Sequence, residues 1–193
     1  MPAPEHARLV VVAASAGGVQ ALRRLLGGLS VRFPWPLAIV QHLSEDSSGL
    51  ARLLASESPL PVREASHGIA IEPGVAYLAP AGYHLMIEQD GHFALSVDEK
   101  VCYVRPSADV LFETAAEAYG LGVVGVVLTG SNEDGAQGLQ RVRELGGLAL
   151  VQDPVEAEER AMPEAALALA GADAVLPLAG LARRLNEEAG CSS

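Results

Sequence analysis

The segment Leu9–Gly18 constrains the fold of this chain more than any other part of the sequence. It begins with six apolar residues, Leu9-Val-Val-Val-Ala-Ala14, which are typical of a strand buried on both faces. Ser15-Ala-Gly-Gly18 follows, and apolar side chains then recur at positions 19, 22, 25 and 26, a helical spacing. The segment therefore predicts a strand that turns into a helix, with Ser15 at the carboxyl end of the strand, beside the backbone N–H groups of a helix N-terminus.

The same alternation of strand and helix recurs along the chain. Apolar runs predict further strands at 37–40, 123–128, 148–151 and 174–176, and helical patterns cover 49–55, 105–119, 136–145, 163–170 and 178–188. Strand-like pieces between 74 and 97, with Asp90-Gly91 as a type I′ turn signal, predict an antiparallel hairpin insert near residues 75–97. We therefore predict an α/β fold: a doubly wound, mostly parallel sheet flanked by helices, in a single domain over 1–193 with its core at about 9–188.

Composition excludes several classes of function. The 193-residue chain has a formal net charge of −11, which argues against nucleic acid or an anionic membrane surface as a partner. No apolar run approaches the roughly 18 residues that span a bilayer, and no signal peptide is evident, so we expect no membrane insertion and a cytoplasmic location. Cys102 and Cys191 form neither a disulfide framework nor a metal-binding pattern, and we expect no metal.

Three polar residues stand at or just beyond the carboxyl ends of predicted strands: Ser15, His42 and Asp134. These ends converge on one crevice in an open α/β sheet, where a Ser, a His and an acid would form a nucleophile, its base and the group that orients the base. Each residue also has a simpler interpretation, because Ser15 and Asp134 are good helix N-caps and His42 could be a hydrogen-bonded structural residue. Glu45, Asp46 and Asp109 compete with Asp134 for the role of the acid.

At this point the sequence resembles a known family, the catalytic domain of CheB-type chemotaxis protein-glutamate methylesterases. The resemblance runs in order from about residue 9 to 182. It rests on Ser15-Ala-Gly-Gly18, Gln41-His42, Ala76-Tyr-Leu-Ala-Pro80, Arg105-Pro-Ser-Ala-Asp-Val-Leu-Phe112, Leu128-Thr-Gly-Ser-Asn-Glu-Asp-Gly-Ala-Gln-Gly138 and Met162-Pro163-Glu-Ala165.

The resemblance implies a serine hydrolase that removes methyl groups from glutamate γ-methyl esters on a helical segment of a receptor protein, releasing methanol. Some relatives also deamidate glutamine. Ser15 would be the nucleophile, His42 the general base and Asp134 the acid that orients His42, and no cofactor is required. Backbone N–H groups near Ala16 and Gly17 could hold the oxyanion.

Departures from the family pattern fall near the expected pocket. Ala16 replaces the usual Thr, and Ser131-Asn132 replaces Met-Gly. Arg105 could contact a substrate or hold the helix that follows it. Relatives in chemotaxis commonly carry an N-terminal receiver domain, whereas only eight residues precede the first strand here, so we expect activity without a phosphodonor. Control would then come from a separate regulatory protein, from the local substrate concentration or from a domain outside this sequence.

Two other classes of function remain open from the sequence. The chain could be a catalytically weak or inactive binding or adaptor domain of a chemosensory pathway that keeps the fold. It could also be a nucleotide-binding module that uses the turn Ser15–Gly18, although this turn matches neither G-x-G-x-x-G nor the P-loop pattern.

Overall fold

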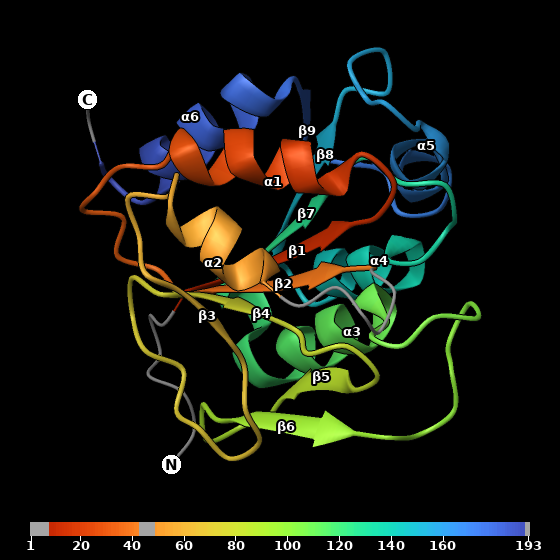
Figure 1. The fold of residues 1–193 in the computed structure, drawn as a ribbon. Helices are drawn as coiled ribbons and strands as arrows, with labels where there is room; N and C mark the ends of the chain where they lie inside the picture. The colour runs from red at the N-terminus through yellow and green to blue at the C-terminus, as the bar shows by residue number, and fades with distance from the viewer. Residues whose placement is uncertain (1–7, 43–48, 192–193) are drawn as a thin grey trace.

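The computed structural model describes residues 8–42 and 49–191. Within these residues, a seven-stranded sheet in the order β3-β4-β2-β1-β7-β8-β9 runs through the middle of the molecule, and all its pairings are parallel (Figure 1). Its strands are β1 (Leu9–Ala14), β2 (Leu37–Gln41), β3 (Val62–Glu64), β4 (Ala76–Leu78), β7 (Val123–Val127), β8 (Leu148–Gln152) and β9 (Ala174–Leu176).

Helices cover both faces of this sheet, as the doubly wound prediction requires. The helices are α1 (Gly18–Gly27), α2 (Leu50–Ala55), α3 (Ala108–Tyr119), which continues into a short 3₁₀ turn η1 (Gly120–Gly122), α4 (Ala136–Glu144), α5 (Ala161–Leu169) and α6 (Leu178–Glu188). Alternate residues of β1 serve the two faces. Val10 and Val12 pack with α1, α2 and α6, whereas Val11 and Ala13 pack with α3, α4 and α5.

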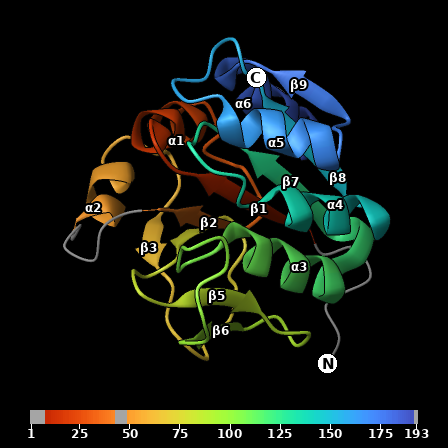
Figure 2. The same ribbon diagram turned by 90° about the vertical axis from the view of Figure 1, so that its right-hand side faces the viewer.

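The central strand β1 is also the point where the direction of winding reverses. The chain first adds β2, β3 and β4 on one side of β1 and then returns to add β7, β8 and β9 on the other side. The carboxyl ends of β1 and β2 point to the right in Figure 1, and Figure 2 turns this side toward the viewer. Ligands of open α/β sheets bind at this edge, at the strand where the order reverses.

The antiparallel hairpin expected near 75–97 is formed by β5 (His84–Ile87) and β6 (Phe93–Ser96). It lies against α3, where the N–H of Ile87 donates to Thr114 Oγ1 at 3.1 Å, and the edge-to-face pair of Tyr77 and Phe93 joins it to the sheet. The strand-like piece at Ala76–Leu78 is not part of the hairpin. It pairs in parallel with β2 and β3 in the main sheet, and its three residues are all buried.

Two local predictions differ from the structure. The turn between β5 and β6 is not type I′, because Gly91 alone has a positive φ, and the loop closes through Gly91 N–H to the Glu88 carbonyl at 3.0 Å. The strand β3 was not predicted at all, because Val62-Arg-Glu64 carries two charged residues and its apolar pattern is too short to detect. No helix among the described residues is long and apolar enough to cross a membrane.

Candidate active site

Ser15 and His42 occupy equivalent positions after two neighbouring strands. The register of β1 and β2 ends at the pair Ala14↔Gln41, and the N–H of His42 continues the ladder by donating to the Ala14 carbonyl at 3.1 Å. Because side chains alternate along a strand, Ser15 and His42 point to the same side of the sheet, the side covered by α3 and α4. The structure thus brings the predicted nucleophile and the predicted base to adjacent positions.

The turn after β1 depends on two glycines. Gly17 has a φ of 75°, a left-handed conformation that favours glycine, and the N–H of Gly18 closes the turn on the Ser15 carbonyl at 2.8 Å. A Cβ on Gly18 would lie 2.0 Å from Gln41 Oε1, so a larger residue would displace Gln41. The amide of Gln41 donates to the carbonyls of Ser15 at 2.8 Å and His42 at 3.0 Å, which ties the two strand ends together.

The imidazole of His42 is paired with Asp134. His42 Nε2 lies 2.7 Å from Asp134 Oδ2, and the side chains are 10% and 0% exposed. An ionised Asp134 accepts the Nε2–H, which leaves Nδ1 as the acceptor nitrogen of the ring; this tautomer is assigned from the hydrogen-bond network. Asn132 Nδ2 lies 3.3 Å from Nδ1 and donates to it. Nδ1 is therefore the basic nitrogen of the ring, and the Asn132 amide would have to release it before it could accept a proton from Ser15.

Asp134 is held as a carboxylate by the start of α3. Its Oδ1 accepts the hydroxyl of Ser107 at 2.7 Å and the N–H of Asp109 at 3.1 Å, and its Oδ2 accepts the N–H of Ala108 at 2.6 Å. Burial alone would favour the protonated acid, but the hydrogen bonds from His42, Ala108 and Ser107 outweigh it and lower the pKa of Asp134. An acid that stays ionised can orient His42 and stabilise its protonated form.

Asp109 caps the neighbouring helix in return. Its Oδ1 accepts the N–H groups of Gly135 at 2.9 Å and Gly138 at 2.7 Å, at the start of α4. A Cβ on Gly138 would lie 2.5 Å from Phe112 Cβ, so only glycine lets the two helices come this close. Burial raises the pKa of Asp109 to about 6, with a further contribution from the charge of Asp134. The acids of α3 and of the loop before α4 thus each cap the other helix.

These contacts separate the candidate acids. Asp134 contacts His42, whereas the hydrogen bonds of Asp109 go to α4, and the helix N-cap of α4 is Gly135 rather than Asp134. Glu45 and Asp46 lie outside the described residues. The alternative of Asp134 as a cap is correct in one respect, because it caps α3 and not the helix that follows it in sequence.

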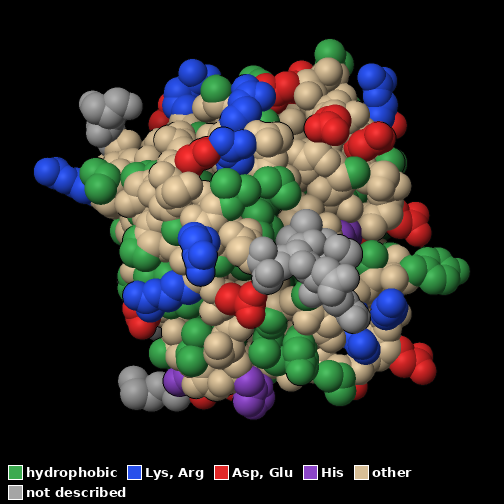
Figure 3. All heavy atoms as spheres, viewed as in Figure 1, with side chains coloured by type: hydrophobic (Ala, Val, Ile, Leu, Met, Phe, Trp, Pro, Cys, Tyr) green, Lys and Arg blue, Asp and Glu red, His purple; other side chains and the backbone are tan. Residues whose placement is uncertain are grey.

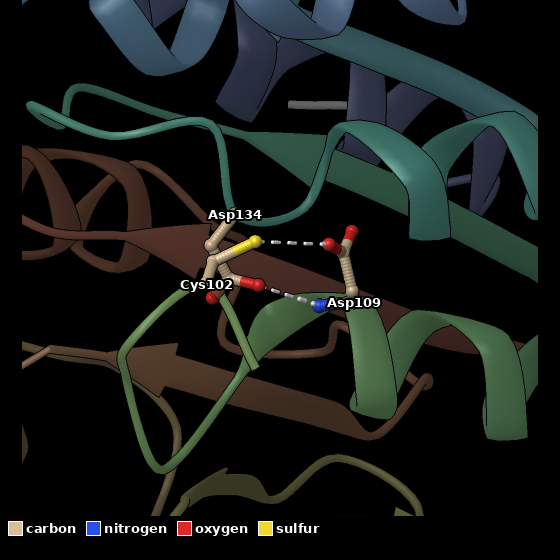
Figure 4. Close-up of side chains that lie close together, drawn as sticks. All are labelled: Cys102, Asp109 and Asp134. Atoms are coloured by element: carbon tan, nitrogen blue, oxygen red, sulfur yellow. Dashed lines mark hydrogen bonds between the residues drawn. The ribbon is translucent and has the colours of Figure 1, made fainter. Parts of the chain in front are cut away.

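Cys102 completes a group with the two acids (Figure 4). Its Sγ lies 3.9 Å from Asp109 Oδ2, and burial together with the charges of Asp109 and Asp134 raises the pKa of the thiol. The ligand atoms of Cys102, Asp109 and Asp134 lie within 4.8 Å of one another. The group does not fit a metal ion, because the oxygens of Asp134 and Oδ1 of Asp109 already accept two hydrogen bonds each, and the thiol is protonated at neutral pH.

The predicted pocket residues divide into two groups. Asn132 lies in the site, since its Oδ1 accepts the N–H of Asp134 at 3.1 Å while its amide contacts His42. Ser131 is exposed beside it. Arg105 is used elsewhere: its Nη1 donates to the carbonyls of Val97 and Asp98, both at 2.9 Å, which fixes the segment after β6 rather than the helix that follows Arg105.

Ala16 and Gly17 face the open side of the nucleophile turn. Ala16 is exposed, and no described residue accepts a hydrogen bond from the N–H of Ala16 or Gly17. The side chain of Glu158 packs over Gly17, since a Cβ there would lie 2.8 Å from its Oε2. Neither N–H group is therefore bonded to a described residue, and Glu158 is the acidic side chain beside them.

Several supporting residues were not predicted to belong to the site, although Thr129 and Met162 lie in motifs that carry the family resemblance. Thr129 Oγ1 donates to the Ala16 carbonyl at 2.9 Å and accepts the N–H of Glu159 at 2.9 Å, joining the nucleophile turn to the loop before α5. His84 accepts the N–H of Ser107 at 3.2 Å and donates to the Glu99 carbonyl at 2.9 Å. Met162 packs beside Gly130, where a Cβ would also lie 2.9 Å from Ser15 Cβ.

Two hollows in the surface differ in their relation to this site. A groove of about 410 Å³ adjoins it through Asn132, and we call it the Tyr103 groove; it is lined by Cys102, Tyr103, Ser131, Asn132, Glu133, Ala161 and Ala165. A larger hollow of about 740 Å³ lies between α1 and α6. Two arginines of that hollow are paired, Arg23 with Glu57 and Arg24 with Glu156, and the free thiol of Cys191 also lines it.

Comparisons with known proteins agree with this geometry. The model of the CheB methylesterase family matches residues 10–185. A relative from Leptospira interrogans is 45% identical over 90% of both chains. The protein-glutamate methylesterase FrzG of Myxococcus xanthus is 38% identical over 96% of this chain and 59% of its own length.

A solved structure extends the comparison to three dimensions. The Thermotoga maritima CheB methylesterase catalytic domain superposes with a TM-score of 0.91 at 34% identity, covering 94% of this chain and 98% of that domain. The sequence relatives differ in length, since the chain spans 90% of the Leptospira protein but little more than half of FrzG. The match over nearly the whole chain, in sequence and in fold, shows that the protein belongs to the CheB methylesterase family, a family of carboxylic-ester hydrolases.

Proposed function

We propose that this protein hydrolyses γ-methyl esters of glutamate side chains in a receptor-type protein, with Ser15 as nucleophile, His42 as general base and Asp134 as the acid that orients His42. The observation that carries the proposal is the buried His42–Asp134 pair, 2.7 Å apart, at the strand end next to Ser15. The names of relatives support the substrate class, since FrzG and an Anaeromyxobacter dehalogenans protein 44% identical to this chain are both named protein-glutamate methylesterases.

The first half of the reaction forms an acyl-enzyme. Ser15 Oγ attacks the ester carbonyl carbon while its proton passes to His42 Nδ1, and Asp134 stabilises the imidazolium through Nε2. We assign the oxyanion of the tetrahedral intermediate to the N–H groups of Ala16 and Gly17, which have no acceptor among the described residues. Its collapse breaks the bond to the methoxy group, which takes the proton from Nδ1 and leaves as methanol.

The second half restores the enzyme. A water molecule gives its proton to Nδ1 and attacks the acyl carbon, and the Ser15 oxygen leaves with the proton that Nδ1 returns. The products are a glutamate carboxylate and free Ser15. With a glutamine side chain the same steps release ammonia, and the Anaeromyxobacter relative is named for both activities.

The rival functions make different demands on the same turn. A binding or adaptor domain without turnover needs no activated serine, although it could retain the His42–Asp134 pair. A nucleotide-binding module needs a glycine-rich phosphate loop, but the turn Ser15–Gly18 matches neither G-x-G-x-x-G nor the P-loop pattern.

The proposal is tested with two measurements on the purified protein. A fluorophosphonate probe should label Ser15, and incubation with a methyl-esterified receptor fragment should release methanol and a free carboxylate detected by mass spectrometry. Absence of both labelling and methanol release would favour the adaptor function, and tight binding of a nucleotide without labelling would favour the nucleotide-binding module.

A further inference from the structure

The turn 101–104, beside the candidate site, has an unusual backbone. Val101 and Val104 exchange two hydrogen bonds, at 3.1 Å and 3.0 Å, so Cys102 and Tyr103 form a two-residue hairpin turn. Both have positive φ, 50° and 65°, and among the described residues they are the only non-glycine residues that do. Turns of this shape favour Asn and Gly, because a Cβ is strained in this conformation.

This strained turn holds a large aromatic side chain in water. Tyr103 is 94% exposed, the highest exposure among the large hydrophobic side chains that the structure describes. The side chain of Tyr103 therefore gives the fold little packing in return for the strain. Strained backbone conformations cluster at binding and catalytic sites, so the strain at Tyr103 suggests that its side chain contacts a binding partner.

Tyr103 forms one wall of a groove that leads to the site. The Tyr103 groove is also lined by Ala161 and Ala165, one turn apart on α5, and by Ser131 and Asn132. Asn132 contacts His42 at 3.3 Å, so the groove is continuous with the catalytic base. A chain lying in this groove could therefore extend one of its side chains toward Ser15.

The elements that line the Tyr103 groove favour a helical ligand over an extended one. An extended segment binds by adding to a free strand edge. The residues that line the Tyr103 groove lie in a turn, a loop and a helix, and the edge strands β3 and β9 contribute none of them. Small residues such as Ala161 and Ala165 let a second helix approach α5 closely, while the ring of Tyr103 covers its other side.

We propose that the Tyr103 groove binds the helical segment that carries the esterified glutamate, with Tyr103 as its main apolar contact. This inference rests on the proposed methylesterase activity and adds the surface that recognises the substrate protein. Glu133, exposed on the groove, favours a neutral ester over the carboxylate product and a basic residue on the bound helix. The same negative charge of Glu133 would repel the carboxylate product and favour its release.

The test compares a small ester with two peptide esters that differ in their ability to form a helix. The first is p-nitrophenyl acetate, which reports on the triad alone. The second is a peptide with a glutamate γ-methyl ester, stapled as a helix and carrying one lysine, and the third is the same peptide with a proline that breaks the helix. The variants are Tyr103→Ala, Tyr103→Phe and, as the matched control, Leu121→Ala, which removes another exposed apolar side chain at the opposite end of the sheet.

We expect the wild-type protein to prefer the helical ester over the proline-containing ester. Tyr103→Ala should lower kcat/KM for the helical ester roughly tenfold more than for p-nitrophenyl acetate, mainly through KM, because an exposed aromatic anchor contributes to binding and not to chemistry. Tyr103→Phe should keep most of the activity because it keeps the ring, and Leu121→Ala should change none of the three rates.

Other results would overturn the inference. An equal loss of activity of Tyr103→Ala on all three substrates would show that the turn supports the triad and does not bind the substrate. Equal rates of the wild-type protein on the two peptides would show that it does not recognise a helix. Failure of the wild-type protein on every ester, with Ser15 unreactive toward a fluorophosphonate, would instead refute the proposed hydrolase itself.

Discussion

Three helices begin at the carboxyl edge of the sheet near the candidate site, and their N-termini are treated in two different ways. The starts of α3 and α4 are capped by carboxylates, since Asp134 accepts N–H groups of α3 and Asp109 accepts N–H groups of α4. At the start of α1, by contrast, no described residue accepts a hydrogen bond from the N–H of Ala16 or Gly17, although the side chain of Glu158 packs beside Gly17. The N–H groups at the starts of α3 and α4 are thus bonded to carboxylates, whereas two N–H groups at the start of α1 have no acceptor among the described residues.

The difference assigns a task to each helix start. Capping by Asp134 and Asp109 fixes α3 and α4 to each other and holds the acid of the proposed triad in an ionised, oriented state. Under the proposed mechanism, the N–H groups of Ala16 and Gly17 at the start of α1 bind a charge that exists only during the reaction. In this interpretation, the carboxylates of Asp134 and Asp109 stabilise the starts of α3 and α4, and the start of α1 stabilises the oxyanion formed during the reaction.

The largest effect is expected at the open start. Ser15→Ala removes the nucleophile and should reduce methyl-ester hydrolysis by several orders of magnitude, up to roughly 10⁶-fold, while the fold stays intact. The measurement is methanol release at saturating substrate, with circular dichroism as the control for folding. A rate close to that of the wild-type protein would remove Ser15 from the mechanism.

The next largest effect is expected at the capped starts. Asp134→Asn keeps the shape of the side chain but loses the charge that stabilises protonated His42, and comparable triads lose about 10⁴-fold in kcat. Asp109→Asn, which alters the other member of the capping pair, should lose much less activity because Asp109 does not contact His42. A greater loss at Asp109 than at Asp134 would reverse their roles.

A carboxylate placed at the open start should have opposite effects on stability and activity. In Ala16→Asp the new acid lies at the N-terminus of α1, where a negative charge stabilises the helix by about 0.5 to 1 kcal/mol. The same charge competes with the oxyanion, so kcat should fall about 10²- to 10³-fold, the amount lost when one oxyanion donor is removed.

Ala16→Thr is the matched control for that variant, because it adds bulk without charge and restores the residue usual in the family. Thermal unfolding and ester hydrolysis are measured on both variants. If Ala16→Asp hydrolysed esters as fast as Ala16→Thr does, the N–H groups of this turn would not hold the oxyanion.

The sequence predicts the parts of this molecule that depend on local patterns. The strands β1 and β7 are runs of apolar residues long enough to be recognised by themselves. Ser15 follows the end of β1 directly, and His42 follows the end of β2. Strand β3 lies at the edge of the sheet and keeps two charged side chains exposed, so its sequence resembles that of a loop.

The supporting contacts of the site could not be predicted in the same way. Ser107 and Gln41 act through partners 27 and 26 residues away, and the sequence does not show which of its many polar residues will meet. Asp109 was a candidate for the acid of the triad, and only the structure shows that its carboxylate faces α4. Side chains that position other side chains are defined by tertiary packing, not by the pattern around them.

The smallest effect concerns the pH dependence of stability, and it again separates the two capping acids. The pKa of Asp109 in the folded protein is about 6, above its ordinary value, so between about pH 4 and 6 the folded protein keeps a proton that the unfolded chain has released. Raising the pH through this window therefore lowers the free energy of unfolding. Asp134 has the opposite sign: its pKa is lowered, and its contribution to stability is lost only as the pH falls below the ordinary range of an aspartate.

Asp109→Asn should remove the first of these effects and leave the second. We expect the wild-type protein to lose about 1 to 3 kcal/mol between pH 4 and 7 through Asp109, since one pKa unit corresponds to about 1.4 kcal/mol, and the variant to show a flatter profile over that range. Urea unfolding at several pH values measures it. Asp173→Asn is the control, because Asp173 Oδ2 also accepts a backbone N–H, from Ala149 at 2.7 Å, but far from the site. If both variants flattened the profile equally, the pH dependence would come from a lost hydrogen bond in general and not from the buried charge that faces Asp134.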